Sequence, residues 1–200
     1  MTQPEKPQID YRLRPARDAD RDAVWRWRNQ PQVRAAMLTT DEIPYEGHLA
    51  WWERQKADPD YRLMIVERAG TPVAVKTYMQ VKPGKSVWWG FYLTDQVPAE
   101  SREQLDIWAH VETAGILYPF DVLKVDEIYC EVRKENVSVT QWHNRFGFED
   151  IDPSVSPNTK DFALDVKRLG RDRFEERRAK GLFRRESVIE IVSHPMDLPA

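Results

Sequence analysis

The spacing of apolar and polar residues changes several times along this chain. Residues 11–14 alternate as a short strand would, and helical spacing follows around Val24 and Trp27 and again over 45–56. From residue 61 the spacing returns to that of strands, with turns at Gly70 and Gly84. We expect the remaining elements to be strands at 62–67, 72–80, 87–93, 128–132 and 162–166, and helices at 101–122, 137–146 and 171–180.

This order of elements predicts the fold class. Two helices, a run of strands and then alternating helices and strands indicate an α+β fold, an α/β sandwich in which helices pack on a sheet. We expect a disordered lead at 1–10, one domain at 11–170, and a C-terminal helix and tail at 171–200. The apolar alternation at 188–192 suits an added edge strand or a homodimer contact.

Composition argues against several functions. The 200 residues are 41% hydrophobic, enough for one core, and 32% are charged with a net charge of only −3. Because no basic field exists and no apolar run is long enough to span a bilayer, we expect neither nucleic acid nor membrane as a partner. Cys130 is the only cysteine and the N-terminus lacks a signal-peptide pattern, which predicts a cytoplasmic location. The four histidines form no close ligand pairs with Cys130, so we expect no metal site.

One stretch of the chain, residues 126–148, points to a chemistry. Ile128 and Cys130 alternate as in a half-buried strand, and a polar turn leads into a helix that ends at Phe-Gly-Phe. This order resembles the last sequence block of the GNAT acyltransferases, with His143 where that family usually has a tyrosine. Four further motifs are similar to the GNAT branch that acylates nucleotide-linked amino sugars, as in pseudaminic acid synthesis: Tyr-Arg-Leu-Arg-Pro, Trp-Arg-Trp-Arg-Asn, His-Leu-Ala-Trp-Trp-Glu-Arg and Trp-Gly-Phe-Tyr-Leu. The resemblance covers residues 11–170.

The resemblance implies a GNAT fold, with a mixed and mostly antiparallel sheet flanked by helices. It also implies transfer of an acyl group, above all acetyl, from acyl-CoA to the amine of a small molecule. In such proteins the strand equivalent to 88–93 splays from the one equivalent to 128–132. The free backbone N–H groups of Phe91, Tyr92 and Leu93 would then bind the pantetheine and the thioester oxygen.

Two residues of the 126–148 block have implied roles at the donor. His143 would protonate the departing thiolate, because its ordinary pKa of about 6.5 leaves a donor fraction near neutrality. The alternative for His143 is packing against the core. Asn136 would contact the pantetheine arm, cap the following helix through its side-chain oxygen, or do both.

The same resemblance implies an acceptor pocket near the first two helices. Arg28 could donate two hydrogen bonds to a nucleotide phosphate, and Trp51 could stack on a base or sugar ring. A solvated helix end and ordinary packing are the respective alternatives. The expected acceptor contacts are Arg28, Asn29, His48, Trp51 and Tyr78.

The chain departs from the family at the glycine loop that normally holds the CoA pyrophosphate. Bare glycine backbone is needed there for close approach to phosphate, yet Asp106 and Trp108 stand at the expected glycine positions. Ser101 and Gln104 have capping-box spacing. This spacing predicts that the helix begins earlier than in the family and includes the positions of the glycine loop. Arg102, in the first turn of that helix, would then receive a phosphate.

Three functions follow from these observations. The leading one is an N-acyltransferase that uses acetyl-CoA or another acyl-CoA, without a metal, on a small amine such as a nucleotide-linked amino sugar. The second is a catalytically degenerate GNAT domain that serves in binding or assembly. The third is an acyltransferase whose donor is bound to a carrier protein.

Overall fold

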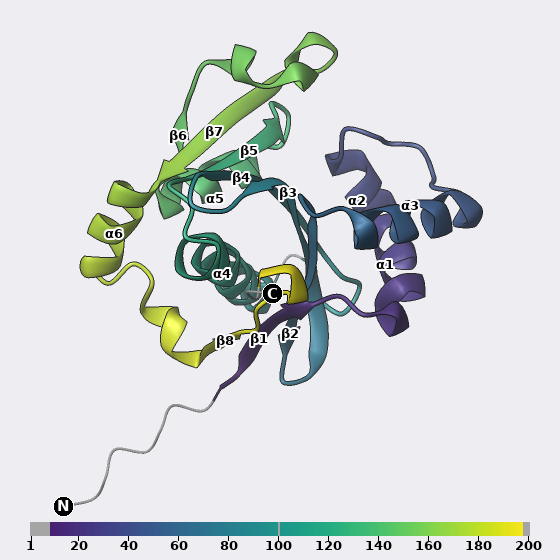
Figure 1. The fold of residues 1–200 in the computed structure, drawn as a ribbon, viewed down its shortest axis with the longest axis horizontal. Helices are drawn as coiled ribbons and strands as arrows, with labels where there is room; N and C mark the ends of the chain where they lie inside the picture. The colour runs from purple at the N-terminus through teal and green to yellow at the C-terminus, as the bar shows by residue number, and fades with distance from the viewer. Residues whose placement is uncertain (1–8, 100, 198–200) are drawn as a thin grey trace, which may run out of the picture.

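The computed structural model describes residues 9–99 and 101–197, and it folds into one mixed sheet with helices on both faces (Figure 1). Most of the lead predicted at 1–10 lies outside the described residues. The eight strands lie in the order β6-β7-β5-β4-β3-β2-β1-β8. Their bounds are β1 Tyr11–Pro15, β2 Arg62–Arg68, β3 Thr71–Lys82, β4 Ser86–Leu93, β5 Glu127–Arg133, β6 Glu149–Asp150, β7 Leu164–Gly170 and β8 Ile189–Ile191. The α-helices are α1 Arg21–Arg28, α2 Pro31–Ala36, α3 Tyr45–Ala57, α4 Arg102–Leu117, α5 Val137–Phe146 and α6 Arg171–Ala179.

The predicted α+β class is confirmed, and most elements lie where the sequence places them. Two differences have local causes. Helix α2 was not predicted; it begins at Pro31, and proline is suited to the first helical position, where no N–H is needed. The helix expected at 101–122 changes at Tyr118–Val122 into a π-helical turn that contains Pro119, whose ring cannot donate in an α-helical ladder.

The sheet divides between β4 and β5. Strands β2, β3 and β4 form an antiparallel meander, and β4 then pairs in parallel with β5. That pairing ends with Trp89 opposite Cys130, although β4 continues to Leu93 beside β3. The splay expected from the sequence is therefore confirmed, and the end of β4 has a free edge.

Helices cover the two faces of the sheet with separate apolar clusters. On one side α1 and α3 contribute Val24, Trp27 and Trp52, which pack against Ile65 and Val75 of the sheet. On the other side α4, α5 and α6 close the larger core, and almost every residue of α4 from Ile107 to Leu117 is buried. Figure 1 shows α1–α3 gathered on one side of the strands and α4 and α6 on the other.

The C-terminal segment is built into this fold. Phe174 and Phe183 are fully buried in the larger core, and β8 pairs in parallel with β1 as an edge strand. The chain then crosses to Arg62 of β2, whose Nε lies 2.8 Å from Asp197 Oδ1 with both side chains 3% exposed. The hydroxyl of Tyr118 donates to the other carboxylate oxygen. A buried ion pair thus fastens the end of the described chain to the sheet.

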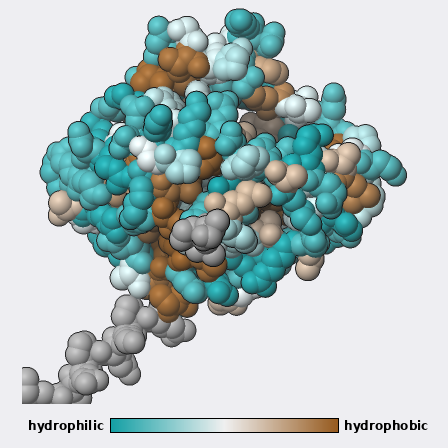
Figure 2. Space-filling view, in the orientation of Figure 1, coloured by the Kyte–Doolittle hydropathy of each residue, from teal (hydrophilic) through white to brown (hydrophobic). Residues whose placement is uncertain are grey.

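Figure 2 shows one face as mostly hydrophilic, with a band of hydrophobic residues running down it. Among residues 9–99 and 101–197, no helix is long and apolar enough to cross a membrane.

We predict that Asp197→Ala destabilises the protein by roughly 3–5 kcal/mol, because the buried Arg62 guanidinium would lose its counter-charge. Chemical denaturation of both proteins would measure the difference. The matched control is Glu176→Ala, which breaks the exposed ion pair to Lys180 and should cost no more than about 0.5 kcal/mol. Equal effects of the two substitutions would contradict the structural role of the buried pair.

Candidate functional site

A cavity of about 730 Å³ opens where β4 and β5 diverge. Its floor is formed by β4 and β5, and α1, α2 and α3 line one side while α4 and α5 line the other. Most of the lining is apolar or aromatic. This cavity contains several of the residues that the sequence singled out.

The free edge of β4 faces this cavity. The N–H of Thr94 donates to Val73 O of β3 at 3.0 Å. Backbone N–H groups alternate in direction along a strand, so the even-numbered residues at the end of β4 direct theirs toward β3. The N–H groups of Phe91 and Leu93 therefore point into the gap beside β5, as the sequence analysis expected. Tyr92 differs, because its N–H faces β3 and only its side chain lines the cavity.

His143 lies in the cavity wall, held from behind by a buried carboxylate. Its Nδ1 is 2.6 Å from Glu112 Oε1 of α4, and the two side chains are 3% and 0% exposed. The ring also packs against Trp89 and Phe148. Because a carboxylate only accepts hydrogen bonds, Nδ1 carries the proton and Nε2 is the nitrogen left for a ligand.

Burial disfavours the charged imidazolium, but the Glu112 carboxylate and the neighbouring Cys130 outweigh it and raise the pKa of His143 to about 10. This value lies well above the ordinary pKa of about 6.5 expected from the sequence. His143 is accordingly a charged donor at neutral pH rather than a partly protonated one.

Together with His143 and Glu112, the buried Lys76 of β3 forms a cluster of ionisable side chains beside the cavity. Its Nζ lies 3.4 Å from the centroid of the Trp89 ring and 4.5 Å from that of Phe91. A side chain on Gly115 of α4 would collide with this ammonium group, so glycine leaves room for it. Desolvation lowers the pKa of Lys76 to about 7, against the attraction of Glu112 and Cys130.

Two polar atoms of the cluster lack partners. Within the described part of the chain, neither Lys76 Nζ nor Glu112 Oε2 has a hydrogen-bond partner. Neither Lys76 nor Glu112 was predicted from the sequence as a site residue. The available signal was a single charged residue within an otherwise apolar run, at 73–76 and at 107–117.

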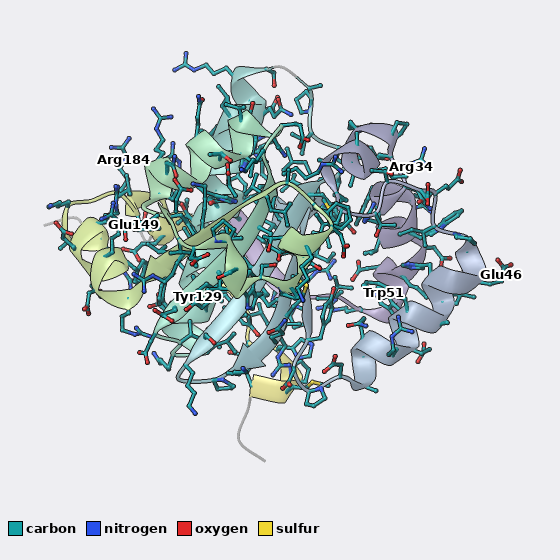
Figure 3. All side chains as sticks on the ribbon, turned by 90° about the horizontal axis from the view of Figure 1, so that it is seen from above. Arg34, Glu46, Trp51, Tyr129, Glu149 and Arg184 are labelled. Atoms are coloured by element: carbon teal, nitrogen blue, oxygen red, sulfur yellow. The ribbon has the colours of Figure 1, made fainter. Side chains whose placement is uncertain are left out.

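Three of the expected acceptor contacts line the cavity. Arg28 donates through Nη2 to Thr39 O at 3.0 Å, while its buried Nη1 has no partner in the described residues. His48 is fixed by a hydrogen bond between Nε2 and Arg21 O at 2.8 Å. Trp51 stacks on His48 and lies on the side of α3 that faces the molecule, opposite the outward Glu46 (Figure 3).

Three other residues that were expected to bind acceptor or donor do not line this cavity. The amide of Asn29 bonds both the N–H and the carbonyl of Ile43 and so fixes a loop. Tyr78 is fully buried and donates to Gly115 O at 3.0 Å. Arg102 lines a separate cleft of about 490 Å³ between α4, α5 and the C-terminal segment.

Two further expectations concerned Asn136 and the position at which α4 begins. Asn136 lines the cavity and also caps α5, accepting from the N–H of Val139 at 3.4 Å. Ser101 caps α4 by accepting from the N–H of Gln104 at 2.9 Å, so the early helix start is confirmed. Both positions where glycines were expected lie inside α4, and Trp108 packs in the cavity wall against Phe91.

No protein-family model and no curated protein matches this sequence. Solved structures do match it. N-acetyltransferase PseH of Campylobacter jejuni is 16% identical with a TM-score of 0.60 over 80% of this chain and 98% of its own. Spermidine N-acetyltransferase of Vibrio cholerae, bound to CoA and spermine, is 15% identical with a TM-score of 0.65 over 83% of this chain and 98% of its own. Aminoglycoside acetyltransferase AAC(6')-Ib, bound to CoA, is 13% identical with a TM-score of 0.69 over 84% of this chain and 99% of its own. At these identities the likeness establishes the fold, which is that of the GNAT acetyltransferases, as the sequence predicted.

We predict that Lys76→Met stabilises the protein at pH 7 and does so less at pH 10. The folded-state pKa of about 7 lies below the ordinary value of about 10.4, so burial costs stability progressively as pH falls through this window. Removing the amine removes that cost, and the melting temperature should rise by roughly 5 °C at pH 7.

The matched control is Lys160→Met, which changes an exposed lysine and should leave the melting temperature nearly unchanged at both pH values. A gain for Lys76→Met that is equal at pH 7 and pH 10 would show that Lys76 is not the titrating group.

Proposed function

We propose that this protein is an N-acyltransferase that moves an acyl group, most simply acetyl, from acyl-CoA to the amine of a small molecule. The observation that carries the proposal is the free edge of β4. Its Phe91 and Leu93 N–H groups open into the cavity that also contains His143. The fold supports the proposal, because the three compared structures are acetyltransferases and two of them hold CoA.

In the proposed reaction the pantetheine arm lies in the gap between β4 and β5 and accepts hydrogen bonds from the free edge of β4. One of these N–H groups polarises the thioester carbonyl, and the amine attacks its carbon. The C–S bond breaks, and the CoA thiolate takes its proton from Nε2 of His143. Glu112 acts as a positioning residue, since it fixes the ring and stabilises the imidazolium that gives up the proton.

For the acceptor we propose a nucleotide-linked amino sugar. Arg28 presents an unpartnered Nη1 at the cavity, which suits a phosphate oxygen, and Trp51 offers a ring face for a base or sugar. We also propose that the protein acts in the cytoplasm, where acyl-CoA is available.

A second candidate concerns the donor, which a carrier protein could present in place of free CoA. The expected pyrophosphate loop is replaced by helix α4, and Trp108 fills part of that wall. The neighbouring cleft contains several guanidinium groups that would suit an acidic carrier protein: Arg102, Arg145, Arg184 and Arg185. Reversing charge with Arg184→Glu and Arg185→Glu should then slow transfer from an acylated carrier without slowing transfer from acetyl-CoA.

We predict that acetyl-CoA binds and that amine acylation depends on His143. His143→Ala should lower kcat by roughly two to four orders of magnitude with little change in acetyl-CoA affinity, measured by thiol release and by calorimetric titration. An absence of binding heat and of thiol release with wild-type protein would refute the acyl-CoA proposal and favour a degenerate binding domain.

Glu112→Gln tests the positioning role separately. The amide keeps a hydrogen-bonding group near Nδ1 but removes the charge that raises the pKa of His143. Because a general acid must be protonated, activity is lost as pH rises through this pKa, and the alkaline limb of the kcat profile should move to lower pH. A profile identical to that of the wild type would exclude Glu112 from this role.

A further inference from the structure

His48 of α3 lies in the wall of the cavity, on the side that α1, α2 and α3 line. Its side chain is buried, and its ring stacks on that of Trp51 with the two centroids 5.4 Å apart. His143 lies in the wall of the same cavity, on the side of α4 and α5. Two buried imidazoles therefore border one cavity, each from a helix on a different face of the sheet.

A single hydrogen bond fixes the tautomer of His48. Nε2 lies 2.8 Å from Arg21 O of α1. Because a carbonyl oxygen only accepts hydrogen bonds, Nε2 carries the proton, and the lone pair of the neutral ring is on Nδ1. Nδ1 makes no hydrogen bond within the described part of the chain. The protein thus holds this ring through one nitrogen and leaves the basic nitrogen for a ligand.

The surroundings of His48 favour the neutral ring. Burial lowers the pKa of His48 below its ordinary value of about 6.5, and the positive charge of Arg21 acts in the same direction. The hydrogen bond to Arg21 O and the Asp22 carboxylate oppose this shift. Because Arg21 and Asp22 form an ion pair at 3.0 Å, their charges largely cancel at the ring. His48 is accordingly an unprotonated base at neutral pH.

The two histidines of the cavity differ in what holds them. The Glu112 carboxylate lies against Nδ1 of His143, whereas the partner of His48 is a neutral backbone carbonyl. The first environment favours the imidazolium and the second the neutral imidazole. Two titratable groups whose environments differ in this way can serve as acid and base at the same pH. The cavity therefore has a proton donor beside α4 and a proton acceptor beside α1.

We propose that His48 is the general base of the acyl transfer and accepts the proton that the acceptor amine loses. The proposal rests on the acyltransferase function proposed above, with the acceptor in the part of the cavity that α1, α2 and α3 line. It makes His48 a catalytic residue and not only a contact of the acceptor.

The protons balance over one turnover. The neutral amine attacks the thioester carbonyl carbon, and its nitrogen becomes positively charged as the N–C bond forms. Nδ1 of His48 takes a proton from this nitrogen, directly or through one water. The C–S bond breaks, and the CoA thiolate takes a proton from Nε2 of His143. His48 then releases its proton to water, and His143 regains one from water.

The test compares the pH profile of kcat for wild-type protein and His48→Gln, with acetyl-CoA as donor and a UDP-linked amino sugar as acceptor. Glutamine can still donate to Arg21 O but cannot take up a proton. Because a base must be unprotonated, wild-type activity should fall as pH drops through the pKa of His48, below about 6.5. His48→Gln should lower kcat roughly 100-fold and lose this acidic limb, with unchanged acetyl-CoA affinity in calorimetric titration.

Chemical rescue separates proton transfer from a structural role. The activity of His48→Ala should rise with added imidazole, because imidazole can enter the vacated space and accept the proton. The matched control is His110→Gln. His110 is a buried histidine that also bonds a backbone carbonyl, Asp106 O at 2.8 Å, but it does not line the cavity. Its substitution should leave the pH profile of kcat unchanged.

Three results would overturn the inference. The first is a His48→Gln protein that keeps the wild-type kcat and acidic limb. The second is a rise in KM for the amine alone, which would make His48 a binding contact. The third is a His48→Ala protein whose lost activity does not respond to imidazole, which would assign the loss to structure. In all three cases the acyltransferase function stands, whereas a wild-type protein that transfers no acetyl group would remove the function and the inference together.

Discussion

The early end of the β4–β5 ladder is the constraint on which the rest of this molecule depends. Backbone N–H groups inside a protein must find partners, and a sheet normally supplies them. Here β4 continues for four residues beyond its last partner on β5, so its edge keeps donors that only a ligand or water can satisfy. The surrounding helices hold this edge open and form the walls of a cavity around it.

A buried electrostatic cluster lies at the apex of this gap. Glu112 is fully buried and its charge is balanced mainly by His143, while Lys76 loses much of its own charge through desolvation. Such an arrangement contributes little net stability, because the desolvation of each group offsets the attraction between them. It holds a protonated imidazole at the point where the strands part, which suits the proton transfer proposed above.

Local signals in the sequence were sufficient for most elements of the fold, although α2 and the short strand β6 were not predicted. Helix α5 has the predicted bounds, because the Asn136 cap and the left-handed Gly147, with φ of 105°, mark its two ends. The splay of the strands came from family resemblance, not from periodicity.

Only part of the candidate site could be predicted from the sequence. His143 and the β4 edge were found, because each belongs to a recognisable motif. Glu112 and Lys76 were not, because only tertiary packing brings Glu112 to His143, 31 positions away along the chain, and Lys76 to Trp89 of the next strand. Tyr78 was expected in the pocket from strand adjacency alone, but its side chain is fully buried against α4 and donates to Gly115 O.

The most direct test of the central claim is a crystal structure of the protein soaked with acetyl-CoA. The account predicts density for the pantetheine arm between β4 and β5, with the thioester oxygen accepting from the N–H of Phe91 or Leu93 and the sulfur beside His143. An empty gap at saturating acetyl-CoA, or acetyl-CoA bound elsewhere on the molecule, would contradict it.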